Sequence, residues 1–329
     1  SGTTGRPKRI PRTHRNIAAT SADVMRLMQT SARERCLNLA PMAFSQGLNA
    51  LLNTLWAGGS VVALPGFDLA RLPERIAAFR PIWFSATPTV LRAIATDEAA
   101  SAAVRTHPPR LIRASAGAIS AGEIALLEER FGAPVLHSYG MSEASYIAGE
   151  PFGAARRKPG SAGLANYEVE IRGDDGHPLP PGETGEIVTR GPNVFPGYLN
   201  DPAANAAVLL PDGWFRTGDV GRVDEDGFLF VTGRLKEMIK RGGVSIGPLE
   251  IEEALRDDPA VAEACVFGVP HPELGEDVAA AVVLRPGALA TERGLRHRVA
   301  ALLSPAKTPR HIVFVTEIPK TETGKAQRG

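Results

Sequence analysis

The first half of the chain alternates between short apolar runs and longer segments whose apolar residues recur with a helical period. The apolar runs are typical of buried strands, and turn residues such as Gly58-Gly59 separate the elements. This alternation predicts a layered α/β sheet with largely parallel strands. The expected helices are 16–29, 47–56, 69–79, 88–95 and 121–131, and the expected strands are 37–40, 61–64, 82–85, 111–115 and 135–138.

The pattern changes after about Gly149, where Gly, Pro, Asp and Asn become dense. Short strands at 168–172, 185–190 and 227–232 then predict a small antiparallel β module. After Arg234 the chain predicts a small α+β domain, with helices at 248–256 and 291–303 and strands at 261–269, 278–284 and 311–315. We therefore expect a large domain over 1–235, with the β module at about 150–235, and a small domain over 236–329.

Composition narrows the classes of protein. The 329 residues are 43% hydrophobic and 22% charged, as in ordinary globular proteins, and the net charge of +1 gives no support for nucleic acid binding. No apolar run is long enough to span a bilayer. Cys36 and Cys265 stand far apart, without Cys or His at metal-ligand spacing nearby, which fits a reducing compartment. We therefore expect a cytoplasmic protein.

The opening segment SGTTGRPKR is close to a Walker phosphate loop but departs from it. Gly2 and Lys8 have the Walker spacing, whereas Pro7 replaces the second Gly and Arg9 replaces the Ser/Thr that would hold magnesium. Its hydroxyls, unobstructed N–H groups and lysine can still wrap a polyphosphate as an anion nest. A flexible Ser/Gly connector is the alternative.

Two further segments carry groups that suit a nucleotide. HSYGMSEAS (137–145) follows a predicted strand and offers a ring for a base, a hydroxyl for a phosphate and a carboxylate for magnesium. An ordinary exit from a strand is the alternative. The segment 213–243 places Asp219 and Arg234 at strand ends, where a carboxylate can accept the ribose hydroxyl protons. A charged β-hairpin would have the same composition.

A last segment, IPKTETGKAQR (318–328), puts Lys325 after a glycine turn, although a solvated basic tail would look the same. Six motifs together resemble the adenylate-forming (ANL) superfamily in order and spacing: SGTTGRPK, YGMSE, GEIVTRGPNVFPGYLND, GWFRTGDVG, GRLKEMIKRGG and PKTETGK. This superfamily holds AMP-forming acyl- and aryl-CoA synthetases, adenylation domains of peptide synthetases and luciferases. The resemblance implies a partial large α/β domain and a small mobile C-terminal α+β domain.

The resemblance also implies which residues hold ATP. The phosphate loop would comprise Ser1, Gly2, Thr3, Thr4, Gly5 and Lys8. Tyr139 would pack on adenine, the backbone around Gly117 and Ala118 would line the same slot, and Gly140 would also bind the nucleotide. Asp219 and Arg234 would hold the ribose.

The same resemblance assigns the reacting centre and the moving parts. Ser142 would contact the α-phosphate, Glu143 would bind Mg²⁺, and Lys325 would be the catalytic lysine that bridges the substrate carboxylate and the α-phosphate. Family members more often have Thr at the position of Ser142. Lys236 would be the hinge of the small domain, and the thiol channel would use Arg241, Gly242 and Gly243.

The pocket for the acyl group departs from the family pattern. In PMAFSQG (41–47), Phe44 stands where many CoA ligases have His, and no Asp is present nearby for an amino group. A pocket of Phe44, Gly47 and Leu48 suits an apolar or small aromatic acid, though these residues could equally belong to the core. The segment 127–145 resembles the oxalate-activating branch, which the missing His weakens. The family's segment before the phosphate loop is also absent, and we expect this chain to be a fragment.

The function that these observations predict is an AMP-forming acid–thiol ligase that uses ATP, Mg²⁺ and coenzyme A. The nearest alternative is an adenylation domain that loads the phosphopantetheine of an acyl or peptidyl carrier protein. An inactive nucleotide-binding remnant is the alternative of another class, which the retention of Glu143, Asp219, Arg234 and Lys325 opposes. Pro7 and Arg9 disfavour a plain P-loop NTPase, and nothing in the sequence requires a luciferase-like oxygenase.

Overall fold

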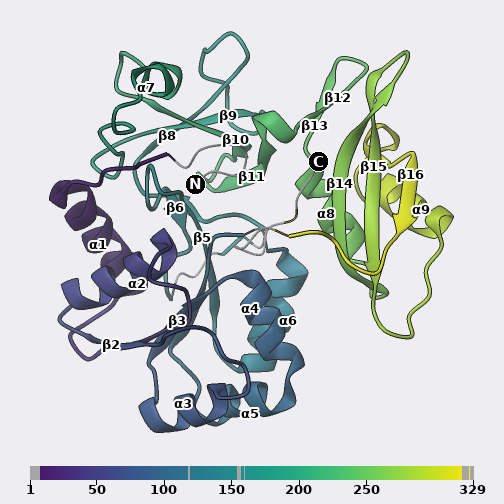
Figure 1. Cartoon of the computed structure of the whole chain (residues 1–329). Coiled ribbons are helices and arrows are strands. Elements are labelled where there is room, and N and C mark those ends of the chain that lie inside the picture. Colours follow the sequence, from purple (N-terminus) through teal and green to yellow (C-terminus); the bar gives the residue numbers. More distant parts are fainter. Residues whose placement is uncertain (1–7, 118, 154–156, 159, 321–325, 327–329) are drawn as a thin grey trace. The chain divides into compact units, whose positions relative to one another are not determined.

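The structure is a computed structural model that describes residues 8–117, 119–153, 157–158, 160–320 and 326 (Figure 1). The chain divides into two compact units. The first comprises Ser1–Glu183, Ile187–Thr217 and Val223–Phe230, and the second comprises Thr184–Glu186, Gly218–Arg222 and Val231–Gly329. None of the helices in the described ranges has the length and hydropathy that a bilayer crossing needs.

The first unit is organised by a seven-stranded sheet with the order β2-β1-β3-β4-β5-β6-β7. The first five strands in this order pair in parallel, and β6 and β7 continue the sheet in antiparallel fashion from β5. The predicted α/β layered sheet is therefore confirmed. Its strands are β1 Arg35–Asn38, β2 Ser60–Ala63, β3 Trp83–Ala86, β4 Leu111–Ala114, β5 Val135–Tyr139, β6 Ala148–Gly149 and β7 Leu164–Ala165.

Helices cover both faces of this sheet, as Figure 1 shows. The register aligns Leu37, Phe84 and Ile112 in one row, which packs in a single apolar cluster with residues of α3, α4, α5 and α6. The neighbouring row of Cys36, Trp83 and Leu111 packs on the opposite face with residues of α1 and α2. Successive side chains alternate between faces, so the central strands β1, β3 and β4 are buried on both sides, whereas the edge strand β2 is partly exposed. The helices are α1 His14–Met28, α2 Ser45–Trp56, α3 Leu72–Phe79, α4 Pro88–Thr96, α5 Glu98–Thr106 and α6 Ala121–Phe131.

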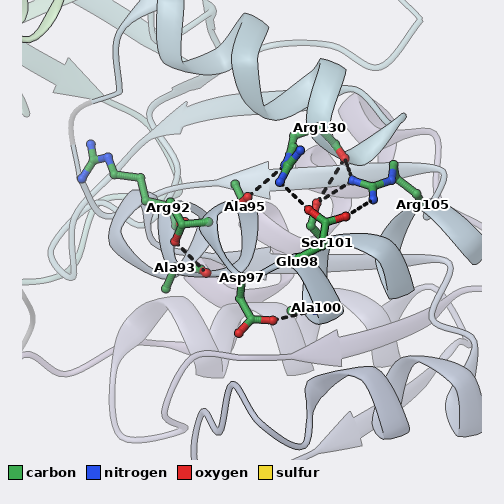
Figure 2. A network of polar contacts seen from close by, with 10 residues as sticks. Arg92, Ala93, Ala95, Asp97, Glu98, Ala100, Ser101, Arg105 and Arg130 are labelled. Atoms are coloured by element: carbon green, nitrogen blue, oxygen red, sulfur yellow. Dashed lines mark hydrogen bonds and ion pairs between the residues drawn. The ribbon is translucent and has the colours of Figure 1, made fainter. Parts of the chain in front are cut away.

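Helix α5 was not predicted, because its alanine-rich sequence EAASAAVRT has few large apolar residues. The Asp97 side chain caps it by accepting a hydrogen bond from the Ala100 N–H at 2.8 Å. Glu98 then forms ion pairs with Arg105 and with Arg130 of α6, each at 2.7 Å (Figure 2). Local capping, the pair with Arg105 inside the helix and the pair with Arg130 of α6 define the element where hydrophobic periodicity does not.

The β module is a four-stranded sheet with the order β11-β10-β9-β8, and the division between the two units runs through it. Strands β8, β9 and β11 were predicted, whereas β10 and the short helix α7 were not. The elements are β8 Glu168–Arg172, β9 Gly185–Arg190, α7 Pro202–Val208, β10 Phe215–Val223 and β11 Leu229–Arg234.

The second unit contains a five-stranded sheet in which β13, β12, β15 and β14 follow one another and β16 pairs with β15. Pairing is antiparallel except for the parallel β15–β16 pair. Residues of α8 and α9 join the strands in one apolar cluster, which makes the predicted small α+β fold. The elements are η1 Leu235–Glu237, β12 Ile239–Arg241, β13 Val244–Ile246, α8 Pro248–Arg256, β14 Val261–His271, β15 Gly275–Leu284, α9 Glu292–Leu302, η2 Pro305–Lys307 and β16 His311–Phe314.

Candidate functional site

The loop after β5 is a tight turn that only glycine can begin. A Cβ added at Gly140 would lie 1.7 Å from the Ser145 carbonyl oxygen, far inside van der Waals contact. The loop closes where the Ile147 N–H donates to the Tyr139 carbonyl at 3.0 Å. This geometry fixes the half-buried Tyr139 at the carboxyl end of β5 and carries Ser142 and Glu143 on the turn that follows it.

Tyr198 contacts both Glu143 and Lys8, although the three residues are far apart in the sequence. The Glu143 side chain is nearly inaccessible, at 5% exposure, and its Oε1 accepts a hydrogen bond from the phenol of Tyr198 at 3.0 Å. The Lys8 Nζ lies 4.3 Å from the centroid of the Tyr198 ring, within the range of a cation–π contact. Phe195 fixes the same loop through its N–H, which donates to the Glu143 carbonyl at 2.8 Å. The structure thus brings together Lys8 and Glu143, which the sequence predicted, through Tyr198, which it did not.

Tyr198 remains a hydrogen-bond donor at physiological pH. Burial and the neighbouring Glu143 carboxylate raise the pKa of Tyr198 well above its ordinary value. Phe195 and Phe215 pack edge-on around this corner, with ring centroids 4.9 Å and 5.5 Å apart in the two pairs Phe195–Tyr198 and Phe195–Phe215. Tyr198 belongs to the motif GEIVTRGPNVFPGYLND, which the sequence analysis singled out. The motif alone does not indicate that the phenol contacts Glu143.

The described residues of the site can supply only part of the ligand set of a Mg²⁺ ion. Among the described residues, no three His, Cys, Asp or Glu side chains gather closely enough to hold a metal ion. Glu143 by itself supplies a single, pre-positioned carboxylate. Because Mg²⁺ commonly binds one or two carboxylates together with substrate phosphates, the residues fit a metal that arrives with the nucleotide.

The structure describes part of the expected adenine slot and the surroundings of Ser142, the residue expected to contact the α-phosphate. The Ser142 and Ser45 hydroxyls lie 3.4 Å apart, which connects the loop to the first turn of α2. His137 makes hydrogen bonds with the backbone of Ser161, at 3.1 Å from Nδ1, and of Gly117. Burial lowers the pKa of His137, although the hydrogen bond to Ser161 and the Glu150 carboxylate act in the opposite direction. His137 was quoted in the motif but received no role from the sequence.

The three residues expected to line an acyl pocket differ in their surroundings. Phe44 and Leu48 are each 40% exposed, whereas Gly47 is buried. A Cβ on Gly47 would lie 2.3 Å from the Pro41 carbonyl oxygen, and the Gly47 carbonyl accepts from the Asn38 side chain at 3.1 Å. Gly47 therefore allows a close approach of backbone to backbone at the start of α2.

In the second unit, Asp219 and Arg234 form an ion pair. Arg234 ends β11 as the sequence predicted, whereas Asp219 lies in the middle of β10 and not at a strand end. Their Oδ1 and Nε atoms lie 3.0 Å apart, and Asp219 is buried. Lys236 stands in the short helix η1 directly after Arg234. Gly242 and Gly243 form the turn between β12 and β13 with φ of 56° and 84°, a conformation that favours glycine. Arg241 at the base of this turn pairs with the buried Asp277 at 2.8 Å.

The remaining predicted residues lie outside the described part of the chain. They are Ser1, Gly2, Thr3, Thr4, Gly5, Ala118 and Lys325. Their roles stay predictions.

Comparison with known proteins identifies the family. Residues 1–199 match the AMP-binding enzyme family, and residues 250–325 match the AMP-binding enzyme C-terminal domain. The chain therefore belongs to the AMP-binding enzymes, the adenylate-forming superfamily that its motifs resemble. Its fold agrees with this membership, because it superposes on ATP-bound MatB from Rhodopseudomonas palustris with a TM-score of 0.91 at 31% identity, over 99% of this chain and 65% of that one.

Two curated relatives are named as CoA ligases. A probable CoA ligase (CCL9) of Humulus lupulus is 37% identical over 335 residues, which cover 100% of this chain and 63% of the relative. The oxalate–CoA ligase of Arabidopsis thaliana is 34% identical over 334 residues, which cover 100% and 65%. The chain thus spans somewhat less than two thirds of the length of these relatives.

Proposed function

We propose that the protein is an AMP-forming acid–thiol ligase. It activates a carboxylic acid with Mg-ATP to an acyl-adenylate, releases pyrophosphate, and transfers the acyl group to coenzyme A. The observation that carries the proposal is the assembly of Lys8, Tyr198 and Glu143 beside the Tyr139 turn, in a chain that belongs to the AMP-binding enzymes. The CoA ligase names of its relatives support coenzyme A as the acceptor.

The residue types suit the first half-reaction. The substrate carboxylate attacks the α-phosphorus, and negative charge moves onto the departing pyrophosphate, so catalysis depends on positioning and electrostatic stabilisation. Lys8 supplies a cation for the leaving phosphates, and Glu143 supplies the protein ligand for the metal that arrives with ATP. In the second unit, Asp219 accepts hydrogen bonds from the ribose while Arg234 holds its carboxylate in place.

The second half-reaction uses the small domain. We place the hinge at Lys236, with the domain boundary at 235/236, and assign the thiol channel to Arg241, Gly242 and Gly243. The positive φ angles of the two glycines support a narrow turn that a pantetheine arm can approach closely. We also propose a cytoplasmic location, because both cysteines of the chain are buried thiols without a disulfide.

The test follows pyrophosphate release from Mg-ATP over a panel of carboxylic acids, with and without coenzyme A. Release with one class of acid, sustained only when coenzyme A is present, would establish the ligase. A low plateau that coenzyme A does not lift would contradict coenzyme A as acceptor and indicate carrier-protein pantetheine. No release with any acid would contradict adenylation and indicate a nucleotide-binding remnant.

Two variants make the test specific. Lys325→Ala is expected to lower adenylation by on the order of 10²–10³-fold, because it removes a charge-assisted contact to the reacting groups. Lys236→Pro is expected to impair thioester formation more than adenylation, because a hinge must absorb large dihedral changes. Adenylation by Lys325→Ala at the parent rate would remove that lysine from the reaction.

A further inference from the structure

One face of the large sheet changes from apolar to polar toward the carboxyl ends of its strands. On the face covered by α1 and α2, the row of Cys36, Trp83 and Leu111 is apolar. Two residues further along each strand, on the same face, the row reads Asn38, Ser85 and Arg113. All three are buried. Ligands of open α/β sheets bind at the carboxyl ends of the strands, which is where this row lies.

Arg113 is a buried cation that no carboxylate neutralises within the described part of the chain. It is 9% exposed, and its Nε donates a hydrogen bond to the Ser138 hydroxyl at 3.1 Å. Its Cζ also lies 5.0 Å from the centroid of the Tyr146 ring. By contrast, Arg110 on the same segment pairs with Glu34 at 3.0 Å. Because Arg keeps its charge in proteins, an anion near Arg113 would offset a desolvation cost that the fold leaves uncompensated.

A second buried polar group follows Arg113 on this face. Ser115 is 8% exposed, and its Oγ has no hydrogen-bond partner among the described residues. Its N–H still donates to the Ala86 carbonyl at 3.3 Å, so the backbone continues the strand and Ser115 follows Arg113 on the same face. A buried hydroxyl without a partner among the described residues and a buried guanidinium without a carboxylate, two residues apart, are the groups that recognise a carboxylate or sulfonate.

The polar row is connected to the expected reacting centre. Gln46, in the first turn of α2, donates to the Ser85 hydroxyl at 3.3 Å, and Asn38 donates to the Gly47 carbonyl at 3.1 Å. Ser45, the residue before Gln46, lies 3.4 Å from the Ser142 hydroxyl. The first turn of α2 thus touches both the row that contains Arg113 and the residue expected to contact the α-phosphate.

We propose that Arg113, assisted by Ser115, binds a second anionic group of the acid substrate. The preferred substrate class is then a small acid with one carboxylate that is activated and a second carboxylate or sulfonate that stays ionised. This inference rests on the proposed function and names its substrate class. It differs from the apolar or small aromatic acid expected from the sequence, because the buried row that the first turn of α2 contacts is polar.

The experiment compares pairs of acids of similar size in pyrophosphate release from Mg-ATP. Malonate is paired with butyrate, and sulfoacetate with 3,3-dimethylbutyrate. We expect kcat/KM to be at least about tenfold higher for the dianion of each pair, because a hydrogen-bonded charge pair contributes that much or more. Arg113→Gln is expected to lower kcat/KM for malonate by on the order of 10²-fold while changing butyrate little. Arg113→Lys should restore part of the malonate activity.

Two further variants and a stability measurement separate an effect on recognition of the second anionic group from an effect on folding of the protein. Arg110→Gln removes a partly buried, paired arginine nearby, and it should affect malonate and butyrate alike. Ser115→Ala is a small change that should lower kcat/KM for malonate by roughly three- to tenfold, since it removes one hydrogen bond, even if Arg113→Gln proves unstable. Thermal unfolding of each variant monitors the fold.

The outcomes distinguish this inference from the proposed function. Pyrophosphate release that favours the monoanion of each pair, or equal losses for both acids in Arg113→Gln, would overturn the inference and leave the ligase in place. No release with any acid would contradict the ligase. In that case, calorimetric titration with malonate tests the anion subsite by itself. Malonate binding that is equally strong in the parent protein, Arg113→Gln and Ser115→Ala would overturn the subsite as well.

Discussion

The phenol of Tyr198 donates a hydrogen bond to the Glu143 carboxylate at 3.0 Å, and the same ring carries the Lys8 ammonium on its face at 4.3 Å from the centroid. One side chain therefore holds two groups of opposite charge that are both assigned to the leaving pyrophosphate, one directly and one through the metal. Lys8 would meet the leaving phosphates, and Glu143 would meet the metal bound to them. Tyr198 is in this view a positioning residue.

Tyr198→Phe keeps the ring and removes only the donor to Glu143. We expect the Mg²⁺ concentration for half-maximal pyrophosphate release to rise on the order of tenfold, because hydrogen bonds that orient a metal ligand commonly affect metal binding by that amount. Binding of Mn²⁺ in the presence of ATP, followed by electron paramagnetic resonance, gives a readout that does not depend on turnover. Tyr139→Phe is the matched control, and an equal effect in both variants would argue against a specific role for Tyr198.

The ion pair of Asp219 and Arg234 predicts how the second unit binds the ribose. Asp219→Asn keeps the shape of the side chain but removes its charge, which weakens both the hold of Arg234 and the acceptance of ribose hydroxyls. We expect the affinity for ATP to fall on the order of 10-fold or more, in line with a lost hydrogen bond to a charged group. Calorimetric titration with ATP and with 2′,3′-dideoxy-ATP checks it, since the loss should be confined to the nucleotide that carries the hydroxyls.

His137 predicts a specific loss of stability in mild acid. Its folded-state pKa is lowered by burial, so below the unfolded value of about 6.5 the unfolded chain binds the proton more readily than the folded one. Stability is therefore present above pH 6.5 and declines as the pH falls from there toward the folded-state pKa. Thermal unfolding between pH 8 and pH 5 should show a steeper decline for the parent than for His137→Gln. Parallel curves for the two proteins would contradict the assignment.

The turn at Gly140 predicts a large penalty for a single methyl group. Gly140→Ala would place Cβ 1.7 Å from the Ser145 carbonyl oxygen, so the backbone of the loop must move. We expect a loss of about 1–3 kcal/mol in unfolding free energy, as for overpacked interiors, together with weaker ATP binding. Gly66→Ala is the matched control, because a Cβ there meets nothing within 4 Å. Chemical denaturation of both variants tests the difference.

The sequence by itself determined the family and the order of most helices and strands. Helices α6 and α8 and strands β8 and β9 have the predicted bounds, because large apolar residues with a clear period and turn residues at their ends are local signals. Helix α5 was missed, since small residues leave its apolar pattern weak and its capping and ion pairs define it instead. Motifs pointed to Lys8, Glu143, Asp219 and Arg234, because each of these residues stands in a short contiguous motif that can be recognised without knowing the fold.

Only the tertiary structure decided which side chains act together. Tyr198 reaches Glu143 across 55 residues of sequence, and no local pattern reports such a meeting. Arg113 reads in sequence as one polar residue in an apolar strand. Its significance comes from the strand register, which aligns it with Asn38 and Ser85, and from the absence of a carboxylate partner among the described residues. Register and burial are set by long-range packing of the whole sheet, and so they decide which charges remain to be neutralised by a ligand.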